Sequence, residues 1–492
     1  MARDGEVTMA TDYEMVVGLE VHCQLATATK LFCGCGTDGF GSTANTRVCP
    51  VCTGQPGVLP VLNKRAVELA FQSALALECG LADQSIFARK NYFYPDLPKA
   101  YQISQYEKPF SQHGGLEIKL KEGAAKRIRI LRIHLEEDAG KLLHEIGSEI
   151  LDHSLVDFNR GGVPLIEIVS EPDIRSSEEA YAYLTALKEV LQHAGVSRCD
   201  MEKGEMRCDA NVSLRPRGQE EFGTRAEIKN LNSFKGVKEA LEYEYGRQAS
   251  VLEGGGRIVL ETRLWDAQRI ATFAMRSKEE AHDYRYFPDP DLVPLVAEPR
   301  WVQSLQAALP ELPAAKRRRF ETSYALSEYD ADVLASDKAV SVFFEEAMKS
   351  LPAEAAKALA NLVINDLLGK LNAENKTVQN CPIKPAMMGD LVKAVQSGKI
   401  SSKGAKEVFA KMWETGKQVS SLIDDLGLSQ VSDEAQVRAW VQEAMAANTK
   451  AAEDLRAGKD RAIGSIVGMV MKLSKGKANP ALVNQLIKDA VK

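Results

Sequence analysis

The sequence predicts an α+β protein, in which a first domain with an antiparallel or mixed sheet is followed by helical domains. Short β-type runs, separated by Gly, Pro and Asn, recur over residues 1–295. Beyond Pro294 these runs become rare, and Ala- and Leu-rich segments with helical periodicity replace them. The length of 492 residues is too great for a single core, so about two to four domains are expected.

The first domain, residues 1–295, alternates strands with helical stretches. Strands are expected at residues 13–25, 127–135, 161–170, 208–216, 224–231 and 257–265, and helices at residues 63–78 and 176–194. After this domain, helical periodicity marks residues 351–371, 385–398 and 434–447. Gly and Ser interrupt the pattern near residues 397–403. We therefore expect a middle helical domain over residues 296–400 and a small all-α tail domain over residues 401–492.

The composition is that of a globular protein, with 45% hydrophobic and 26% charged residues. No apolar run approaches the ~20 residues that cross a bilayer. The first residues, MARDGEVTMATDYE, contain no apolar signal segment. A cytoplasmic protein with no membrane partner is therefore expected. Its nine cysteines are expected to be reduced thiols or metal ligands.

Charge is distributed unevenly along the chain. The net charge is −6, but residues 455–492 hold eight basic and two acidic residues, which leaves −12 on residues 1–454. A basic end on an acidic body suits contacts with the phosphates of a nucleic acid. The alternative is a solvated lysine-rich tail.

Polar side chains gather on one face of several expected strands, because side chains alternate faces with period two. The polar faces carry Glu20, His22 and Gln24 on the first strand, Arg207, Asp209 and Asn211 on a later one, and Arg225, Glu227 and Lys229 on the next. Half-exposed sheets show the same pattern where the polar face meets water, and that alternative stays open.

Other acids fit a water-facing position less well. Residues 136–138 are three consecutive acids after an apolar strand, and Glu167 lies inside the apolar run PLIEIV. A buried carboxylate needs a partner or a cation. Glu20 and His22, two residues apart, also present two ligands side by side. Such oxygen ligands with an imidazole suit Mg²⁺ or Mn²⁺, so the pattern predicts a metal–phosphate site on one sheet face.

The usual P-loop, G-x-x-x-x-G-K-[ST], does not occur in the sequence. If the chain handles ATP, it does so through metal-bridged phosphates and basic side chains such as Lys99, Arg160 or Lys229. The sequence also lacks a G-x-S-x-G elbow. Hydrolysis of an amide by this chain is therefore not predicted.

Four cysteines fall within twenty positions, as Cys33-x-Cys35 and Cys49-x-x-Cys52. Four thiolates at such spacing in a reduced compartment are typical of a structural Zn²⁺ site. All four coordination positions would be filled by the protein, which leaves none for chemistry. Four unrelated free thiols are the alternative interpretation.

Residues 88–106 concentrate four tyrosines with Arg89, Lys90 and Lys99 in a proline-broken segment. Aromatic and cationic side chains together hold unpaired nucleotides. Packing of the tyrosines in the core is the competing interpretation. The string YFYPD at residues 92–96 is similar to YRYFPD at residues 284–289.

Long strings of the sequence resemble, in the same order, the B subunits of the aspartyl/glutamyl-tRNA amidotransferases. They include YEMVVGLEVHCQL, RKNYFYPDLPKAYQISQY, HLEEDAGK, DFNRGGVPLIEIVSEPDIRS, EMRCDANVSLRP and DYRYFPDPDLVPL, and they cover most of residues 13–295. SSKGAK and GKANPALVNQLI are similar to the tRNA-binding tail of that family. The resemblance therefore spans nearly the whole chain.

The resemblance implies a cradle-like catalytic domain and a ligase that forms a carbon–nitrogen bond with glutamine as amido donor. The family works as a heterotrimer, in which the A subunit, an amidase, frees ammonia, and a small C subunit ties it to the B subunit. With ATP and Mg²⁺, the B subunit phosphorylates the side-chain carboxylate of Glu-tRNA(Gln) or Asp-tRNA(Asn). Channelled ammonia then displaces the phosphate, which gives Gln-tRNA(Gln) or Asn-tRNA(Asn) for translation. The mischarging aminoacyl-tRNA synthetase is a further candidate partner.

Residue by residue, the resemblance assigns Mg²⁺ ligation to Glu20, His22 and Glu137. The remaining catalytic candidates are the acids expected on the same face, Glu136, Asp138, Glu167 and Asp209. Asn211 joins Lys99, Arg160 and Lys229 as a candidate for binding the nucleotide. Some members of the family carry the four-cysteine zinc site, and this chain has all four positions.

Two other functions stay open on the residues alone. One is a non-catalytic RNA-binding scaffold that uses the zinc site and the basic tail. The other is a free-standing ATP-dependent carboxylate–amine ligase for a small molecule. The basic tail argues against the second, because a metabolite ligase has no need for it.

Overall fold

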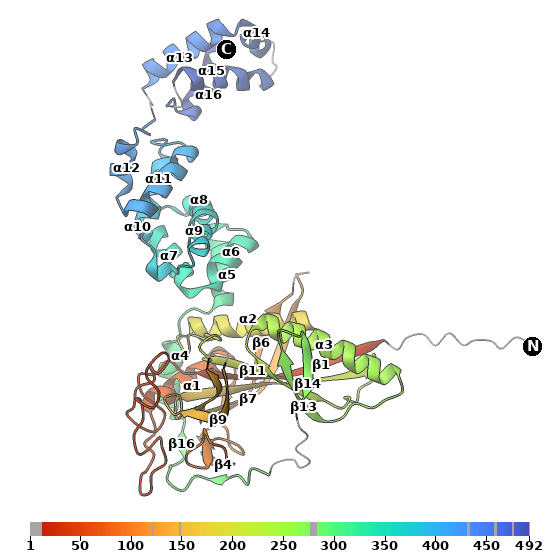
Figure 1. Ribbon diagram of the computed structural model, residues 1–492. Coiled ribbons are helices and arrows are strands. Elements are labelled where there is room, and N and C mark those ends of the chain that lie inside the picture. The colour runs from red at the N-terminus through yellow and green to blue at the C-terminus, as the bar shows by residue number, and fades with distance from the viewer. Residues whose placement is uncertain are drawn as a thin grey trace, which may run out of the picture. The chain divides into compact units, whose positions relative to one another are not determined.

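The computed structural model describes residues 12–120, 123–146, 149–275, 283–430, 433–456, 460–474 and 477–491. The chain divides into two compact units, Met1–Leu312 and Pro313–Lys492 (Figure 1). The first unit contains the strands, and the described part of the second is helical. The predicted α+β fold, with a mixed sheet followed by helices, is confirmed.

A nine-stranded sheet forms the centre of the first unit, in the order β14-β13-β12-β11-β1-β10-β7-β6-β2. Its strands are β1 (Tyr13–Gln24), β2 (Gly80–Leu81), β6 (Ser111–Lys119), β7 (Ala125–Glu137), β10 (Pro164–Ser170), β11 (Met206–Pro216), β12 (Ala226–Leu231), β13 (Glu261–Asp266) and β14 (Ala271–Ala274). β12 and β13 run parallel, and the other neighbours run antiparallel. Because β1 lies between β10 and β11, distant parts of the sequence meet at the centre of the sheet.

Three helices pack against the apolar face of this sheet, namely α1 (Lys64–Ala76), α2 (Ser177–His193) and α3 (Phe234–Glu253). Each begins after a residue whose side chain accepts hydrogen bonds from the free amides of the first turn. Asn63, Ser176 and Ser233 are these caps. Apolar side chains from the helices and the sheet share one large core.

The first unit continues past residue 295. Helix α4 (Pro299–Ala307) follows this position, and its Trp301 packs on the core of the sheet domain. The Trp301 ring centre lies 5.3 Å from that of Phe71 in α1. The sequence of α4 is helical, as expected after Pro294, but its packing partner is the first domain.

Smaller sheets border the central one. β4 (Ala88–Asn91) lies between β5 (Tyr101–Ser104) and β15 (Phe287–Pro288). β3 (Gln84–Ser85) pairs with β16 (Leu295–Val296), and β8 (Lys141–Ile146) pairs with β9 (Glu149–Asp157). Ser104 Oγ in β5 donates a hydrogen bond of 2.9 Å to Glu136 Oε2 in β7. The three-stranded sheet therefore adjoins the C-terminal end of β7.

The second unit is a succession of short helices. They are α5 (Pro313–Tyr324), α6 (Glu328–Ser336), α7 (Lys338–Met348), α8 (Ala356–Asn361), α9 (Leu368–Ala373), α10 (Pro385–Gln396), α11 (Ser402–Thr415), α12 (Val419–Asp425), α13 (Glu434–Ala447), α14 (Thr449–Arg456), α15 (Ile463–Leu473) and α16 (Pro480–Val491). A π-helical segment, Leu362–Leu367, joins α8 to α9, and 3₁₀ turns lie at Ala353–Ala355, Val378–Asn380 and Asp460–Ala462. One core extends from Phe320 to Ile423 and another from Val437 to Ile487, so α11 and α12 pack with the middle helices.

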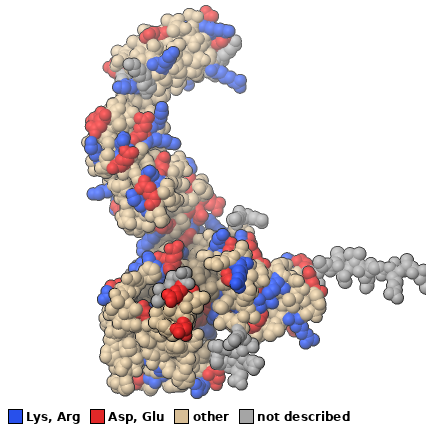
Figure 2. Space-filling model, viewed as in Figure 1, with Lys and Arg blue, Asp and Glu red and all other residues tan. Residues whose placement is uncertain are grey.

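Basic side chains of the tail are exposed. They are Arg456, Arg461, Lys472, Lys477 and Lys488, and Figure 2 shows blue side chains projecting from this part of the chain. Lys459, Lys475 and Lys492, also part of the predicted basic end, lie outside the described residues. None of the helices over the described ranges combines the length and the apolar character needed to cross a bilayer.

Candidate functional site

The polar face of the central sheet presents ionisable side chains from several strands. Alternate residues of β1 are buried in the core, and Glu20, His22 and Gln24 between them face the other way. The antiparallel register places His22 opposite Glu167 of β10, and Glu167 opposite His134 of β7. Three neighbouring strands thus align ionisable side chains in one row.

Together with Glu136 of β7, these side chains form a histidine–carboxylate cluster, by which we mean His22, His134, Glu136 and Glu167. One ligand atom each from His22, Glu136 and Glu167 lies within 4.8 Å of the others. His22 Nε2 is 3.3 Å from Glu167 Oε2 and 3.8 Å from Glu136 Oε1. His134 Nε2 is 3.3 Å from Glu167 Oε2 and 3.4 Å from Glu136 Oε2. The spacing suits a single divalent cation.

Burial and mutual charge set the protonation of the cluster. Burial lowers the pKa of His134, but the charge of Glu167 and hydrogen bonds to both carboxylates outweigh it and raise the pKa to about 9. His22 shows the same balance, and its pKa is also raised. Burial raises the pKa of Glu136 and Glu167, but the two histidines hold the pKa of both below the ordinary range. The carboxylates are therefore ionised at neutral pH. A cation would displace the His22 proton, because imidazole binds metals in its neutral form.

Glu20 lies beside the cluster on the same sheet face. Burial, and then the charge of Glu167, raises its pKa. Its Oε1 accepts a hydrogen bond of 2.9 Å from Asn211 Nδ2. Asp209 lies opposite Glu20 in the register and binds Lys229 Nζ at 2.9 Å. A cavity of about 290 Å³ opens here, lined among others by Glu20, Leu131, Asn211, Phe222 and Arg225.

Asp138 is enclosed by partners from the chain itself. Its carboxylate accepts two hydrogen bonds from Arg207, of 2.9 and 3.0 Å, and one of 2.7 Å from Gln24 Nε2. Arg160 Nε lies 3.7 Å away and donates to the carbonyl of Ala139. Burial raises the pKa of Asp138, but the guanidinium groups outweigh it and hold the pKa below the ordinary range. Asp138 thus binds side chains of the protein itself, and Arg160 binds a backbone carbonyl, at the margin of the site.

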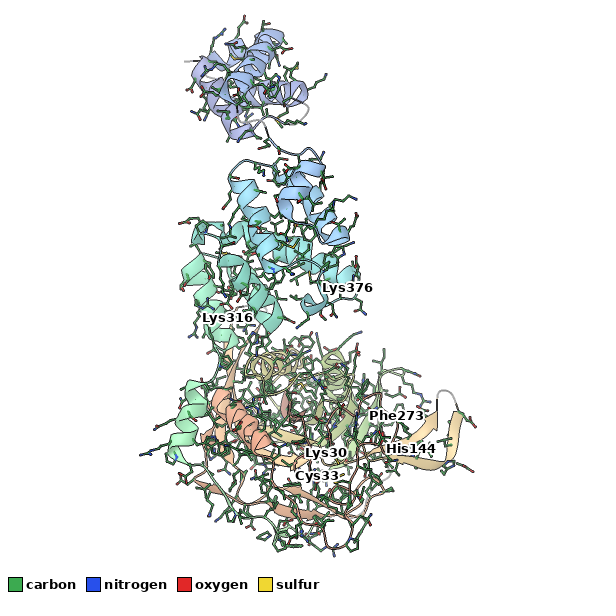
Figure 3. All side chains as sticks on the ribbon, turned by 90° about the vertical axis from the view of Figure 1, so that its left-hand side faces the viewer. Lys30, Cys33, His144, Phe273, Lys316 and Lys376 are labelled. Atoms are coloured by element: carbon green, nitrogen blue, oxygen red, sulfur yellow. The ribbon has the colours of Figure 1, made fainter. Side chains whose placement is uncertain are left out.

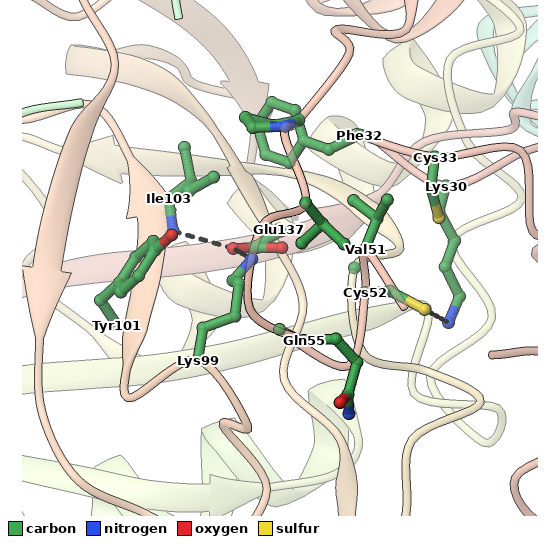
Figure 4. A pocket seen from close by; sticks show the side chains of 14 residues that line it. Lys30, Phe32, Cys33, Val51, Cys52, Gln55, Lys99, Tyr101, Ile103 and Glu137 are labelled. Carbon is green, nitrogen blue, oxygen red and sulfur yellow. Dashed lines mark hydrogen bonds and ion pairs between the residues drawn. The ribbon is translucent and has the colours of Figure 1, made fainter. Parts of the chain in front are cut away.

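Glu137 points away from its neighbour Glu136, because consecutive strand residues face opposite ways. Its Oε1 accepts a hydrogen bond of 3.0 Å from the Ile103 amide and pairs with Lys99 Nζ. This pair lines a cavity of about 120 Å³, shown in Figure 4. The structure therefore does not bring Glu137 together with His22.

The magnesium set expected from the sequence is Glu20, His22 and Glu137. The ligand atoms that lie close together belong to His22, Glu136 and Glu167, with Glu20 beside them. Among the expected nucleotide-binding residues, Asn211 and Lys229 contact the acids of this face, whereas Lys99 contacts Glu137 and Arg160 contacts backbone carbonyls.

The four cysteines of the expected zinc site come together. The sulfurs of Cys33, Cys35, Cys49 and Cys52 lie within 4.8 Å of one another, and those of Cys49 and Cys52 are 3.9 Å apart. Tetrahedral zinc with Zn–S bonds of about 2.3 Å requires sulfurs roughly 3.8 Å apart. A hydrogen bond from Cys33, opposed by burial and aided by the Cys49 amide and Lys30, lowers the pKa of Cys52 to about 4. The residues therefore fit the ion.

Two residues of the site were not singled out from the sequence. His134 could have been found, because it lies on the same strand face as Glu136 by period two. Lys30 gave no such signal. It is fully buried, its Nζ lies 3.6 Å from Cys52 Sγ, and Figure 3 labels it near Cys33. Lysine is almost never fully buried without a partner, and here the thiols and a carbonyl supply one.

Known proteins resemble the chain over nearly its full length. Residues 15–303 match the GatB/GatE catalytic domain family, and residues 342–491 match the GatB domain family. A protein of Carboxydothermus hydrogenoformans is 53% identical, covering 97% of this chain and 98% of its own length. Proteins of Persephonella marina (51%, covering 98% and 100%) and Thermodesulfovibrio yellowstonii (52%, covering 96% and 98%) are similar too. All three are named as the B subunit of an aspartyl/glutamyl-tRNA(Asn/Gln) amidotransferase. With its catalytic-domain match and these relatives, the chain belongs to the family of aspartyl/glutamyl-tRNA(Asn/Gln) amidotransferase B subunits.

Proposed function

We propose that the chain uses ATP to activate the side-chain carboxylate of Glu-tRNA(Gln) or Asp-tRNA(Asn) for amidation by ammonia. The observation that carries this proposal is the histidine–carboxylate cluster on the polar face of the sheet. In it, one ligand atom each of His22, Glu136 and Glu167 lies within 4.8 Å of the others. Membership of the amidotransferase family supports it.

His22, Glu136 and Glu167 would hold the cation, and two carboxylates among three ligands suit Mg²⁺. When bound, Mg²⁺ neutralises charge on the transferring phosphoryl group. His134 bonds to both carboxylates and so fixes their orientation. Glu20, held by Asn211, lies where its carboxylate could accept hydrogen bonds from water on the cation.

The cavity beside Glu20 is the proposed place for ATP. Leu131 and Phe222 offer apolar surface for a base, and Arg225 and Asn211 offer hydrogen-bond donors. Lys229, which binds Asp209, adds positive charge to the same face. The phosphates would then extend from this cavity towards the histidine–carboxylate cluster.

The reaction needs no nucleophile from the chain. A carboxylate oxygen of the aminoacyl group attacks the γ-phosphorus, and the phosphorus–oxygen bond to ADP breaks, which leaves an acyl phosphate. Ammonia attacks the acyl carbon, the bond to phosphate breaks, and the nitrogen loses one proton as the amide forms. Positioning and electrostatic stabilisation supply most of the catalysis in phosphoryl transfer.

The proposed partners follow from the same chemistry. Ammonia would come from an amidase, the A subunit of the complex, joined by a small C subunit, and the tRNA would arrive from a mischarging synthetase. The cytoplasm, where tRNA is charged, is the proposed location. Zn²⁺ on the four cysteines would be structural, because no coordination position remains open.

Neighbouring acids of β7 provide a matched test. Glu136→Gln should lower the affinity for Mn²⁺, a spectroscopic substitute for Mg²⁺, by at least about tenfold. It should also abolish amidation of Glu-tRNA(Gln) when ammonium is supplied directly with ATP. Glu137→Gln should leave Mn²⁺ affinity unchanged, because its carboxylate faces Lys99. Equal Mn²⁺ affinity in the Glu136→Gln variant and the unaltered protein would remove the proposed site.

A further inference from the structure

Four tyrosine rings from two distant segments form a continuous row beside the site. The ring centres of Tyr92 and Tyr284 are 6.0 Å apart, and those of Tyr284 and Tyr286 are 6.3 Å apart. Tyr286 stacks on Tyr106 with centres 4.2 Å apart and an angle of 10° between the ring planes. We call these four residues the tyrosine row. Pairing of β4 with β15, and the bond from the Asn91 amide to the Tyr284 carbonyl, hold the two segments together.

Much of this aromatic surface is open to solvent. Tyr106 is 50% exposed, and the neighbouring Phe93 and Tyr94 are 80% and 55% exposed. Lys90 Nζ lies 4.9 Å from the ring centre of Tyr284, and Arg285 is exposed in the same segment. Tyr92, Tyr284 and Tyr286 are half-buried, so core packing accounts for part of the row but not for the exposed rings of Tyr106, Phe93 and Tyr94. Exposed rings with cations beside them are the combination that binds unpaired nucleotides through base stacking and phosphate contacts.

β5 connects the tyrosine row to the histidine–carboxylate cluster. Ser104, the last residue of β5, donates its hydroxyl to Glu136. Tyr106 follows two residues later, so its Cα lies within roughly 7 Å of that of Ser104. Burial, and then the charges of Glu136 and Glu167, raises the pKa of Tyr286, which agrees with a short separation. A nucleotide stacked on the row would thus lie close to the histidine–carboxylate cluster.

We propose that the tyrosine row, with Phe93 and Lys90, stacks on the unpaired nucleotides at the 3′ end of the aminoacyl-tRNA. The amino acid esterified to the last ribose would then reach the histidine–carboxylate cluster. This inference rests on the proposed function, which brings an aminoacyl ester to the cluster. Stacking tolerates any base, so the same rings serve every tRNA that the enzyme takes.

The adenine of ATP is the other base that could occupy the row. A separate cavity of about 290 Å³ lies beside Glu20, and its lining residue Phe222 already provides apolar surface for the adenine. The tyrosine row is linked to β7 through Ser104, which bonds to Glu136, and it presents several rings in succession, which suits more than one base. ATP would therefore approach the histidine–carboxylate cluster from the side of Glu20 on β1, and the tRNA from the side of β5.

Tyr106→Ala, with Tyr106→Phe as the matched variant that keeps the ring, tests the proposal in the assembled amidotransferase. Affinity is measured for deacylated tRNA and for the same tRNA without its last three nucleotides. We expect Tyr106→Ala to lower the affinity for the complete tRNA about tenfold and to leave that for the shortened tRNA unchanged. Tyr106→Phe should match the unaltered enzyme for both RNAs. In amidation assays, Tyr106→Ala should raise the KM for aminoacyl-tRNA but not for ATP.

Four results would overturn the assignment. Three concern Tyr106→Ala: an equal loss of affinity for both RNAs, a higher KM for ATP, and loss of the amidase on co-purification. The fourth is a defect in Tyr106→Phe as large as that in Tyr106→Ala. Tyr329→Ala, which removes a ring that is 68% exposed on α6, is the control and should change none of these values. If the proposed function itself were wrong, ammonium-supported amidation would not depend on Glu136. If only this inference were wrong, that dependence would remain.

Discussion

Lys30 places a positive charge against the four thiols. Zinc with four thiolates carries a net charge of about −2, and its burial is unfavourable without compensation. The Lys30 ammonium is fully buried, 3.6 Å from Cys52 Sγ and 3.2 Å from the Phe158 carbonyl oxygen. A buried ammonium is equally unfavourable alone. Lys30 and the thiolates therefore stabilise each other.

Replacing Lys30 by methionine keeps the apolar stem and removes the charge. We expect the Lys30→Met variant to bind zinc about 10–100-fold more weakly, because a group outside the four ligands contributes on this scale. Competition with a chromophoric chelator measures the affinity. Lys64→Met, at an exposed position in the first turn of α1, is the control and should bind zinc normally. Normal zinc affinity in Lys30→Met would disprove the charge argument.

The strand faces could be predicted from the sequence, and the contacts between strands could not. Period-two alternation correctly placed Glu20, His22 and Gln24 on one face of β1. It could not reveal that Glu167 lies between His22 and His134, because the register depends on strands that are distant in the sequence, and β1 pairs with β10 more than a hundred residues away. The family resemblance, and not a strand pattern, assigns Glu137 to the cation.

At the level of the elements, a local irregularity between β7 and β10 shows another limit of predicting strand faces from alternation. The register shifts between Val169 and Ser170, where β10 pairs with β7. As a result Ile130 and Ile133, three residues apart, are both buried, whereas Leu131 is 36% exposed and lines the cavity beside Glu20. Strict alternation would have placed Leu131 and Ile133 on the same face. A bulge re-aims side chains in this way.

Helix α3 is fastened to the edge of the sheet through a buried carboxylate. Glu244 of α3 is fully enclosed, and it binds Arg247 of the same helix at 2.8 Å and Arg263 of β13 at 3.0 Å. Thr272 of β14 donates its hydroxyl to the same carboxylate. One side chain thus joins a helix to the edge strand β14 and to its neighbour β13.

Glu244→Gln should destabilise the first unit by about 3 kcal/mol, because the guanidinium groups of Arg247 and Arg263 would then share the single carboxylate of Glu261. Burial raises the pKa of Glu244, but its partners, Arg247 first, outweigh burial and hold the pKa below the ordinary value of 4.5. The stabilisation is therefore complete above pH 4.5 and is lost as the pH falls through the lowered pKa. Urea unfolding measures the free energy of unfolding of the unaltered protein and of Glu244→Gln. The difference between the two free energies should be constant near neutral pH and should become smaller in acid. A difference that did not change with pH would contradict the assignment.

At the level of the whole chain, helical sequence identifies helices but not the core that each one joins. The change of character after Pro294 is visible in the sequence, yet α4 packs on the sheet domain through Trp301. Likewise α11 follows the Gly- and Ser-containing stretch at 397–403, but its Val408 and Met412 belong to the middle core. Apolar periodicity records that a face is buried, not against what it is buried.

The positions of the cores decide where the tail can be removed. A chain that ends after Gln430 keeps the middle core and lacks the core that begins at Val437. We expect this truncation to weaken tRNA binding about tenfold and to flatten its salt dependence, because exposed basic side chains of the tail are lost. Filter binding at several salt concentrations measures both effects. Unchanged affinity, with the first unit still folded by circular dichroism, would rule out the tail as a tRNA-binding element.

The central position of β1 has a consequence for biosynthesis. Among the described residues β1 is the first strand to leave the ribosome, but its neighbours β10 and β11 end only at Ser170 and Pro216. At roughly 5–20 residues per second, both edges of β1 wait on the order of ten seconds for their partners. During this interval the nascent apolar strand is open to wrong pairing and is a natural client for chaperones. The chemistry of the enzyme is thus assembled late in translation, although it depends on the earliest strand.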